Sequence, residues 1–372
     1  MNIQRREFLS AVSTQTAFYC LGNPFRVAGN SNNYCQSFRQ PAFSVIPVVG
    51  DGKWIWRDPP DETGFLEPRD YEVSIGMQFE CTGDSSNLVG TTAAPVQFPE
   101  QKITELKIET VNCDAKVVPL NDSAGQMILS SDYLGKGQVA WAQANYKLKI
   151  FKSYFAFEKE SFPEKQTTRQ SPKEFLKNSP GIKADSKLVK KIMRQTIGES
   201  NHAWDKARNF YNWVWENIEG VPGKYTSVDE AIRKGRGDCE ERACTFIALC
   251  RAAGIPARQV WVPSHVWAEI ALHDYDGRWH WVPIHTAAYN WFGWTGAHEI
   301  ILQKGDRLQL PGRKRTVRLI DDWYRIKGPQ PKMKFTSTIK PVDEGPGRRE
   351  KQRDGQWKVT ADSNNRRLMR DR

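Results

Sequence analysis

The chain has 372 residues, which is long for one domain and suits two. Its formal net charge is +11, but the lysines and arginines are scattered, and part of the excess lies near the C-terminal end. Nucleic-acid-binding proteins gather basic residues on one face. We therefore expect no specific nucleic-acid partner, and at most a weak attraction to anionic surfaces.

The first 30 residues are predicted to be a signal segment. Arg5 and Arg6 precede Phe8 and Leu9, a pattern typical of twin-arginine export signals, and a short, mildly apolar stretch follows. An ordinary basic N-terminus is the alternative. The rest of the sequence has no apolar run long enough to span a membrane. We therefore expect no anchor beyond the signal segment, and a periplasmic or cell-surface location.

A β-rich domain is predicted after an irregular lead-in over residues 31–66, which are rich in Pro, Gly and Asn. Over residues 67–160, β-branched and aromatic residues alternate with polar ones between turn signals, which predicts a β-sandwich-like domain. Cys81 and Cys113 lie in this part, and the sequence leaves a disulfide between them open. A polar, proline-containing linker over residues 161–184 follows.

The second domain is predicted over residues 185–336 and begins with helices. Apolar residues recur at helical spacing over 188–197 and 203–218. Ser227 and Glu230 have the spacing of a capping box, which predicts a short helix directly after Ser227. These helices lead the chain to the motifs described next.

The end of the chain is predicted from composition. Strands are expected over residues 307–311 and 316–326, where β-branched and apolar residues recur. Residues 337–372 have few apolar side chains and many charged ones, and we predict a disordered basic tail there, because such a composition cannot bury a core.

The stretch from Gly237 to Arg258 predicts a helix that begins with a cysteine. Asp238 has the place of an N-cap, and Glu241 lies where a capping box has an acid. Apolar residues recur at helical spacing from Cys239, so the apolar stripe of the helix starts there. A thiol on the first turn faces the positive end of the helix dipole, which lowers its pKa and favours a nucleophilic thiolate.

A β-hairpin is predicted after this helix. Residues 265–272 alternate as in a half-buried strand that begins at His265, Asp274–Gly277 is a turn signal, and a second strand ends at His285. Counting outward from the turn sets position 265 opposite 286, to within one or two residues. We therefore expect His265 and His285 to lie side by side.

Three motifs in this order resemble the transglutaminase-like superfamily of cysteine enzymes. They are GDCEERA, SHVWAEI and WVPIH, which correspond to a G-x-C helix start, an H-x-W-x-E strand and a W-x-x-x-D strand end. The resemblance covers roughly residues 185–325. It implies an α+β, papain-like core in which a Cys-bearing helix packs on an antiparallel sheet, preceded here by the β-sandwich domain.

The resemblance implies that Cys239 is the nucleophile and His265 the general base. The thiolate would attack a carboxamide carbonyl and form a thioester, which an amine or water resolves. The amine outcome is protein cross-linking, and the water outcome is deamidation or proteolysis. The sequence leaves both open. The implied partner is a protein or peptide with a glutamine or amide group, and a possible amine acceptor.

His285 departs from the family pattern, which has Asp at this position. An orienting residue fixes the tautomer of the imidazole and stabilises its protonated form, and a neutral His does only the first well. We therefore predict a triad of Cys239, His265 and His285 with a less stable ion pair. The alternative is a degenerate site, in which Cys239 is structural and the chain is a non-catalytic binding module.

Three further residues of the hairpin are candidates for substrate binding: Trp267, Trp281 and Glu269. Core packing is the alternative for the two tryptophans, and pairing with a cation is the alternative for Glu269. The sequence has no C-x-x-C pair and no EF-hand-like acidic loop, so we predict neither a metal site nor a cofactor.

Overall fold

The computed structural model describes much of the chain from residue 64 to residue 342, with short pieces outside it. The described residues are 36–37, 64–154, 158–166, 170–263, 265–287, 292–293, 295, 298–311, 313–342, 348–351 and 357–360. They belong to the second of two compact units, which spans Tyr34–Arg372. The predicted signal segment and most of the lead-in lie outside the described residues. Within the described part, no helix combines the length and apolar character that crossing a bilayer requires.

Two antiparallel sheets enclose the core of the β-rich region. The smaller sheet has four strands, in the order β15 (Lys332–Pro341), β2 (Gly64–Glu80), β7 (Val139–Tyr154) and β4 (Gln101–Val111). The facing strands of the larger sheet are β14 (Trp323–Lys327), β3 (Ser85–Ala94), β6 (Ala124–Leu134) and β5 (Asp114–Leu120). Ile75 and Leu148 from the smaller sheet pack with Leu88 and Met127 from the larger one in a single apolar cluster. This arrangement is a β-sandwich, as expected, but two of its strands, β14 and β15, come from residues after the predicted range 67–160.

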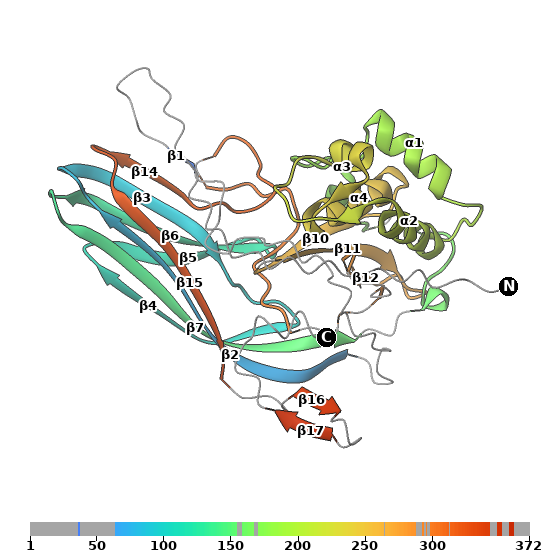
Figure 1. Cartoon of the computed structure of the whole chain (residues 1–372), viewed down its shortest axis with the longest axis horizontal. Helices are drawn as coiled ribbons and strands as arrows, with labels where there is room; N and C mark the ends of the chain where they lie inside the picture. Colours follow the sequence, from blue (N-terminus) through green and yellow to red (C-terminus); the bar gives the residue numbers. More distant parts are fainter. Residues whose placement is uncertain are drawn as a thin grey trace. The chain divides into compact units, whose positions relative to one another are not determined.

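The larger sheet continues from the sandwich into the region of the three motifs. β13 (Gln303–Lys304) pairs with β6 on one side and with β10 (Ala257–Val262) on the other. β11 (His265–His273) and β12 (Trp279–Ile284) follow β10, all antiparallel. One sheet is therefore shared between the sandwich and the hairpin that carries both histidines (Figure 1).

Four helices gather on one side of β10, β11 and β12 (Figure 1). They are α1 (Lys187–Thr196), α2 (Ala203–Asn217), α3 (Val228–Lys234) and α4 (Cys239–Ala252). One half of the capping box predicted at α3 is present: the Ser227 hydroxyl accepts a hydrogen bond from the backbone N–H of Glu230, whereas the Glu230 carboxylate pairs with Lys234. Gly235 ends α3 with a φ of 62°. α4 contacts the other three helices as well as β10 and β11, so it is the central helix of the core.

The remaining elements are short. They are the 3-10 helices η1 (Lys159–Ser161) and η2 (Lys173–Leu176), and the strands β1 (Gln36–Ser37), β8 (Glu219–Gly220), β9 (Arg236–Gly237), β16 (Arg348–Lys351) and β17 (Trp357–Thr360). β8 and β9 pair in parallel directly before α4, and β16 pairs with β17.

The structure differs from the sequence expectations at two strands. β15 runs to Pro341, so residues 337–341 are strand where a disordered tail was expected. Its lysine-rich composition suits an edge strand, because charged side chains stand on its exposed face while Phe335 packs on the core. The alternating pattern that predicted strands within residues 67–160 does not extend over β3, because small residues dominate it. Its pairing with both β6 and β14 compensates for this weak strand propensity.

Three other expectations, for a disulfide and for two strands, can be compared with the structure. Cys81 and Cys113 are both free thiols, so the disulfide left open by the sequence is not formed. The strand expected over residues 307–311 is reduced to a single bridge between Leu308 and Val317. The strand expected over residues 316–326 begins later, at Trp323.

Candidate active site

The start of α4 has the predicted capping box. The Asp238 carboxylate accepts hydrogen bonds from the backbone N–H groups of Glu240 and Glu241, at 2.9 and 3.0 Å. The Glu241 carboxylate accepts one from the backbone N–H of Asp238, at 2.8 Å. Cys239 is the first residue of the helix. Local sequence chemistry alone therefore fixes the thiol at the helix N-terminus, and such a cap contributes about 0.5–2 kcal/mol.

The surroundings of α4 differ from the amphipathic helix that the sequence indicated. Every residue from Cys239 to Arg251 is buried. Helices cover one side of α4 and the sheet covers the other, so its polar residues need partners within the protein. Arg251 donates two hydrogen bonds to the Asp306 carboxylate, and Glu240 pairs with Arg318. The Cys239 side of the helix is thus part of the interior, and this residue is only 2% exposed.

The hairpin register differs by one residue from the expected one. Ala268 lies opposite Ile284, and Leu272 lies opposite His280. Because side chains alternate between the two faces of a strand, a slip of one residue exchanges the faces. The observed register, extended past the last pair, sets His285 on the face that carries His265. β11 is also buried along its whole length rather than half-buried, because packing covers both of its faces.

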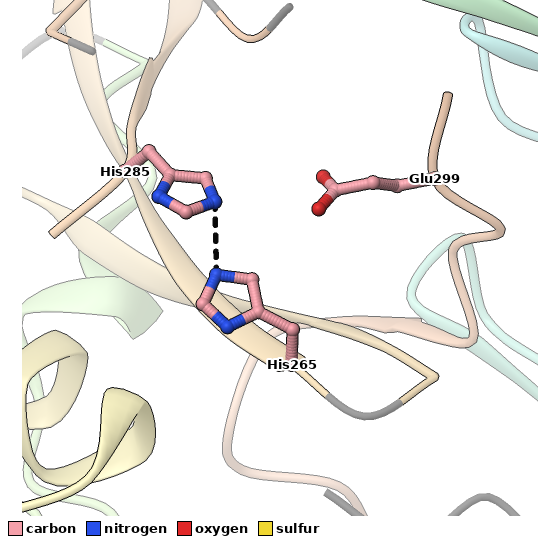
Figure 2. Close-up of side chains that lie close together, drawn as sticks. All are labelled: His265, His285 and Glu299. Carbon is pink, nitrogen blue, oxygen red and sulfur yellow. Dashed lines mark hydrogen bonds between the residues drawn. The ribbon is translucent and has the colours of Figure 1, made fainter. Parts of the chain in front are cut away.

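His265 and His285 are in direct contact. Their Nε2 atoms are 2.9 Å apart, and the two rings are stacked with centroids 4.5 Å apart (Figure 2). Burial lowers the pKa of His265 to about 3, and burial together with the neighbouring His265 holds the pKa of His285 well below its usual range. Both rings are therefore neutral at pH 7. One Nε2 carries a hydrogen and donates it to the other.

The direction of this hydrogen bond decides whether His265 can act as a base. If His265 donates from Nε2, its Nδ1 keeps a lone pair. The Nδ1 atom of His265 is buried and has no hydrogen-bond partner among the described residues. If His285 accepts this hydrogen bond at Nε2, its own proton is on Nδ1, and Nδ1 of His265 is then the free base.

Arg242 connects the thiol and the histidine pair electrostatically. Burial lowers the pKa of Arg242 to about 10, and the nearby Tyr211 and Cys239 partly offset this lowering. The charge of Arg242 in turn lowers the pKa of His285. The Arg242 guanidinium also lies over the Trp215 ring, 4.6 Å from its centroid. A buried cation within electrostatic range of Cys239 favours a thiolate there and opposes protonation of His285.

Glu299 is a third member of the histidine cluster, and no sequence signal pointed to it. It lies in the segment that precedes β13, and its carboxyl group is directed toward the two rings (Figure 2). Burial raises its pKa to about 8, an effect that the side chain of Trp267 partly offsets. One atom from each of His265, His285 and Glu299 lies within 4.8 Å of the others.

The three residues expected to bind substrate have other surroundings. Glu269 is buried and forms ion pairs with Arg258, at 2.6 Å, and with Lys304, at 2.9 Å. Trp267 is buried in a small apolar cluster that includes Val260. These contacts are the ones that the structural alternatives describe, and a part of either residue in substrate binding stays a prediction.

Trp281 is the half-buried member of this trio. Its ring packs against the Arg258 guanidinium, at 3.7 Å from the ring centroid, and edge-on against Phe175. Its part in substrate binding stays a prediction.

Comparisons with known proteins give one family match, one relative and one similar fold. Residues 190–286 match the family model of the transglutaminase-like superfamily. A stretch of 93 residues is 34% identical to an uncharacterized protein of Haemophilus influenzae and covers 23% of this chain and 25% of that protein. The chain thus matches about a quarter of that relative's length.

A solved structure resembles the fold over a longer stretch. The crystal structure of a proposed cysteine protease from Cytophaga hutchinsonii matches with a TM-score of 0.52 at 13% identity, over 75% of this chain and 92% of that one. At this identity the likeness concerns the fold. The family match covers the helix of Cys239 and both histidines, so residues 190–286 are similar to the transglutaminase-like superfamily.

Proposed function

We propose that the protein is a thiol enzyme that cleaves carboxamides through a cysteinyl thioester, with Cys239 as the nucleophile and His265 as its base. The observation that carries the proposal is the 2.9 Å contact between the two Nε2 atoms. It occupies one nitrogen of His265 and leaves Nδ1 without a partner among the described residues. An imidazole held through one nitrogen and open at the other is the arrangement that a general base needs.

The reaction divides into two steps. In the first, His265 takes the thiol proton, the sulfur of Cys239 bonds to the carboxamide carbon, and the C–N bond breaks as the imidazolium returns the proton to the leaving ammonia or amine. In the second, water or an amine attacks the thioester, and the thiol is restored. Water yields a carboxylic acid and an amine yields a new amide. Backbone N–H groups at the start of α4 are the candidates that stabilise the oxyanion.

His285 determines how well the protonated form of His265 is stabilised. A neutral imidazole holds His265 in one tautomer, but it stabilises the imidazolium less than the Asp of the family pattern does. The nearby Arg242 adds to this effect because its charge opposes a positive charge on His285. The proposed enzyme is therefore slow. Its substrate is a protein or peptide with a glutamine or other amide group.

The burial of the site favours a second candidate, a binding module with an inert core. Cys239 is 2% exposed, and His265 and His285 are each 1% exposed. A substrate carbonyl has to reach the sulfur, so a chain in which the thiol stays buried has no acyl chemistry. In that case the β-sandwich would carry the function, by contact with a partner.

One incubation separates these candidates. The protein is mixed with a glutamine-rich protein and a labelled primary amine, and label incorporation, ammonia release and new peptide termini are measured together. Cys239→Ala is the matched control. Incorporation, ammonia release or cleavage that disappears in Cys239→Ala supports the enzyme. If the wild type and Cys239→Ala give equal incorporation, ammonia release and cleavage over a range of amide and ester substrates, the binding module is supported.

We also infer that the protein is exported. The inference rests on Arg5 and Arg6 followed by Phe8 and Leu9. These residues lie outside the described part of the chain. A periplasmic or cell-surface site would bring the enzyme to protein substrates there.

A further inference from the structure

Two imidazoles and a carboxyl group meet in the protein interior. His265 and His285 are each 1% exposed and Glu299 is 6% exposed, and one ligand atom from each lies within 4.8 Å of the others. The Oε2 atom of Glu299 has no hydrogen-bond partner among the described residues. A buried polar atom without a partner costs about 1–3 kcal/mol, so a group that satisfies it stabilises the fold.

We propose that His265, His285 and Glu299 bind one divalent transition metal ion, with Zn²⁺ as the best match, and that the bound ion inhibits the thiol reaction. Two imidazoles and one carboxylate are a ligand set that Zn²⁺ takes in sites with an open fourth position. The inhibition rests on the proposed function. The binding itself does not.

The geometry needs small adjustments to close around an ion. Bonds of about 2.0–2.2 Å in a tetrahedral arrangement set ligand atoms roughly 3.3 Å apart. The two Nε2 atoms, now 2.9 Å apart, would separate slightly. The Glu299 oxygen would approach them by about 1.5 Å or less, starting from within 4.8 Å. Rotation about the side-chain bonds of Glu299 suffices for this, and Figure 2 shows its carboxyl group already directed toward the rings.

The mechanism of inhibition follows from the protons. In the metal-free pair, one Nε2 carries a hydrogen that bridges to the other ring. An ion bound to both Nε2 atoms displaces this hydrogen, and each neutral ring then carries its proton on Nδ1. His265 Nδ1 becomes a donor and no longer accepts the proton of Cys239. The ion therefore removes the base without touching the sulfur.

Arg242 is the charge that opposes the ion, because its positive charge already acts on His285. Glu299 is the member of the cluster that carries negative charge when ionised, and it must offset this repulsion. The affinity should therefore depend on Glu299 at least as strongly as on either histidine. Glu299→Gln keeps the shape of the side chain and removes its charge, which makes it the most informative variant.

Zn²⁺ binding to the purified chain is measured by competition with a chromophoric chelator, and Co²⁺ is used as a spectroscopic probe. We expect one ion per chain, a tetrahedral Co²⁺ spectrum, and a loss of affinity of about 100-fold or more in Glu299→Gln and His285→Ala. His280→Ala is the matched histidine control, because His280 lies on β12 and binds Asp274 instead. Its affinity should equal that of the wild type. Thermal melts establish that each variant is folded.

The role of the thiol is tested in the same series. Cys239→Ala should keep the affinity, and the Co²⁺ spectrum of the wild type should lack the charge-transfer band of a thiolate ligand. Loss of binding in Cys239→Ala would overturn the proposal, since the ion would then sit on sulfur. Equal affinity in wild type and Glu299→Gln would overturn it as well.

Inhibition has its own readout. Zn²⁺ should slow the alkylation of Cys239 in the wild type and leave it unchanged in Glu299→Gln. If the protein binds Zn²⁺ through these three residues but Cys239 is inert, the metal site is supported and the proposed function is contradicted. If Cys239 is reactive but the protein does not bind Zn²⁺, the proposed function is supported and the metal site is contradicted.

Discussion

His265 and His285 lie on adjacent strands and share one hydrogen bond, Nε2 to Nε2, at 2.9 Å in the protein interior. The second histidine occupies the position where the family pattern has Asp. Burial keeps both rings neutral at pH 7, so the pair differs from a His–Asp pair in charge although it has the same connectivity.

Cys239 should be the fast-reacting thiol. Cys244 and Cys250 lie on the same helix, and burial raises the pKa of each thiol well above its usual range. Cys239 is instead the first residue of the helix, where the positive end of the helix dipole favours a thiolate. Brief iodoacetamide treatment at neutral pH followed by peptide mass spectrometry should find the label on Cys239. Dominant labelling of Cys244 or Cys250 would contradict the assignment of the nucleophile.

His285→Ala should lower turnover by about 10²–10⁴-fold, because His265 then loses the group that fixes its tautomer. His285→Asp should retain activity or raise it, since a carboxylate also stabilises the imidazolium. Initial rates on a reactive acyl substrate measure both, with Cys239→Ala as the inactive reference. If His285→Ala and the wild type react equally fast, His285 has no part in the reaction and Cys239 and His265 act as a dyad.

Replacement of Arg5 and Arg6 by lysine should retain a folded reporter fusion in the cytoplasm, because the twin-arginine route requires the paired arginines. Fractionation of cells that express the wild-type and the altered signal fused to the same reporter measures this. The wild-type fusion is the control. Equal export of the two fusions would show that the motif is not the signal.

A chain that ends after Val342 should keep the melting temperature of the full chain, whereas one that ends after Gln330 should lose stability. The first keeps β15 and its ten paired positions on β2, from Lys332 to Pro341, and the second removes them. It also uncovers β2, including the core contact of Phe335 with Phe79. Scanning calorimetry of the full chain and the two shortened chains measures their melting temperatures. A marked drop for the chain that ends after Val342 would mean that the residues beyond it contribute to the fold.

Asp238 should make the stability depend on pH. Burial raises its pKa from 3.8 to about 6, so between these values the folded chain binds a proton that the unfolded chain has lost. This contribution is fully present below pH 4 and is lost as the pH rises through 6, by up to about 3 kcal/mol. Asp238→Asn retains an N-cap side chain and removes the titration. Denaturant unfolding of both proteins from pH 4.5 to 7.5 should show the wild type losing stability relative to the variant. Parallel profiles would contradict the raised pKa.

The cap of α4, the position of Cys239 on its first turn and the presence of a hairpin that ends at His285 were all predictable from the sequence. Each depends on contacts between residues a few positions apart, such as the bond from Asp238 to the backbone of Glu241. The three motifs likewise indicated the family. Interactions of this kind involve residues that are close in the sequence, so a local pattern predicts them. The structure confirms the capping box and the place of Cys239, and the family model matches this region.

Only the tertiary structure decided how these elements meet. The hairpin register lies one residue from the expected one because packing on both faces of β11, and not the turn alone, selects it. Glu299 reaches the histidines from a segment that no motif marks. β13, only two residues long, joins the sandwich to the strands that carry the two histidines. These are contacts between residues far apart in sequence, and their free energy depends on the whole folded core, so no local pattern encodes them.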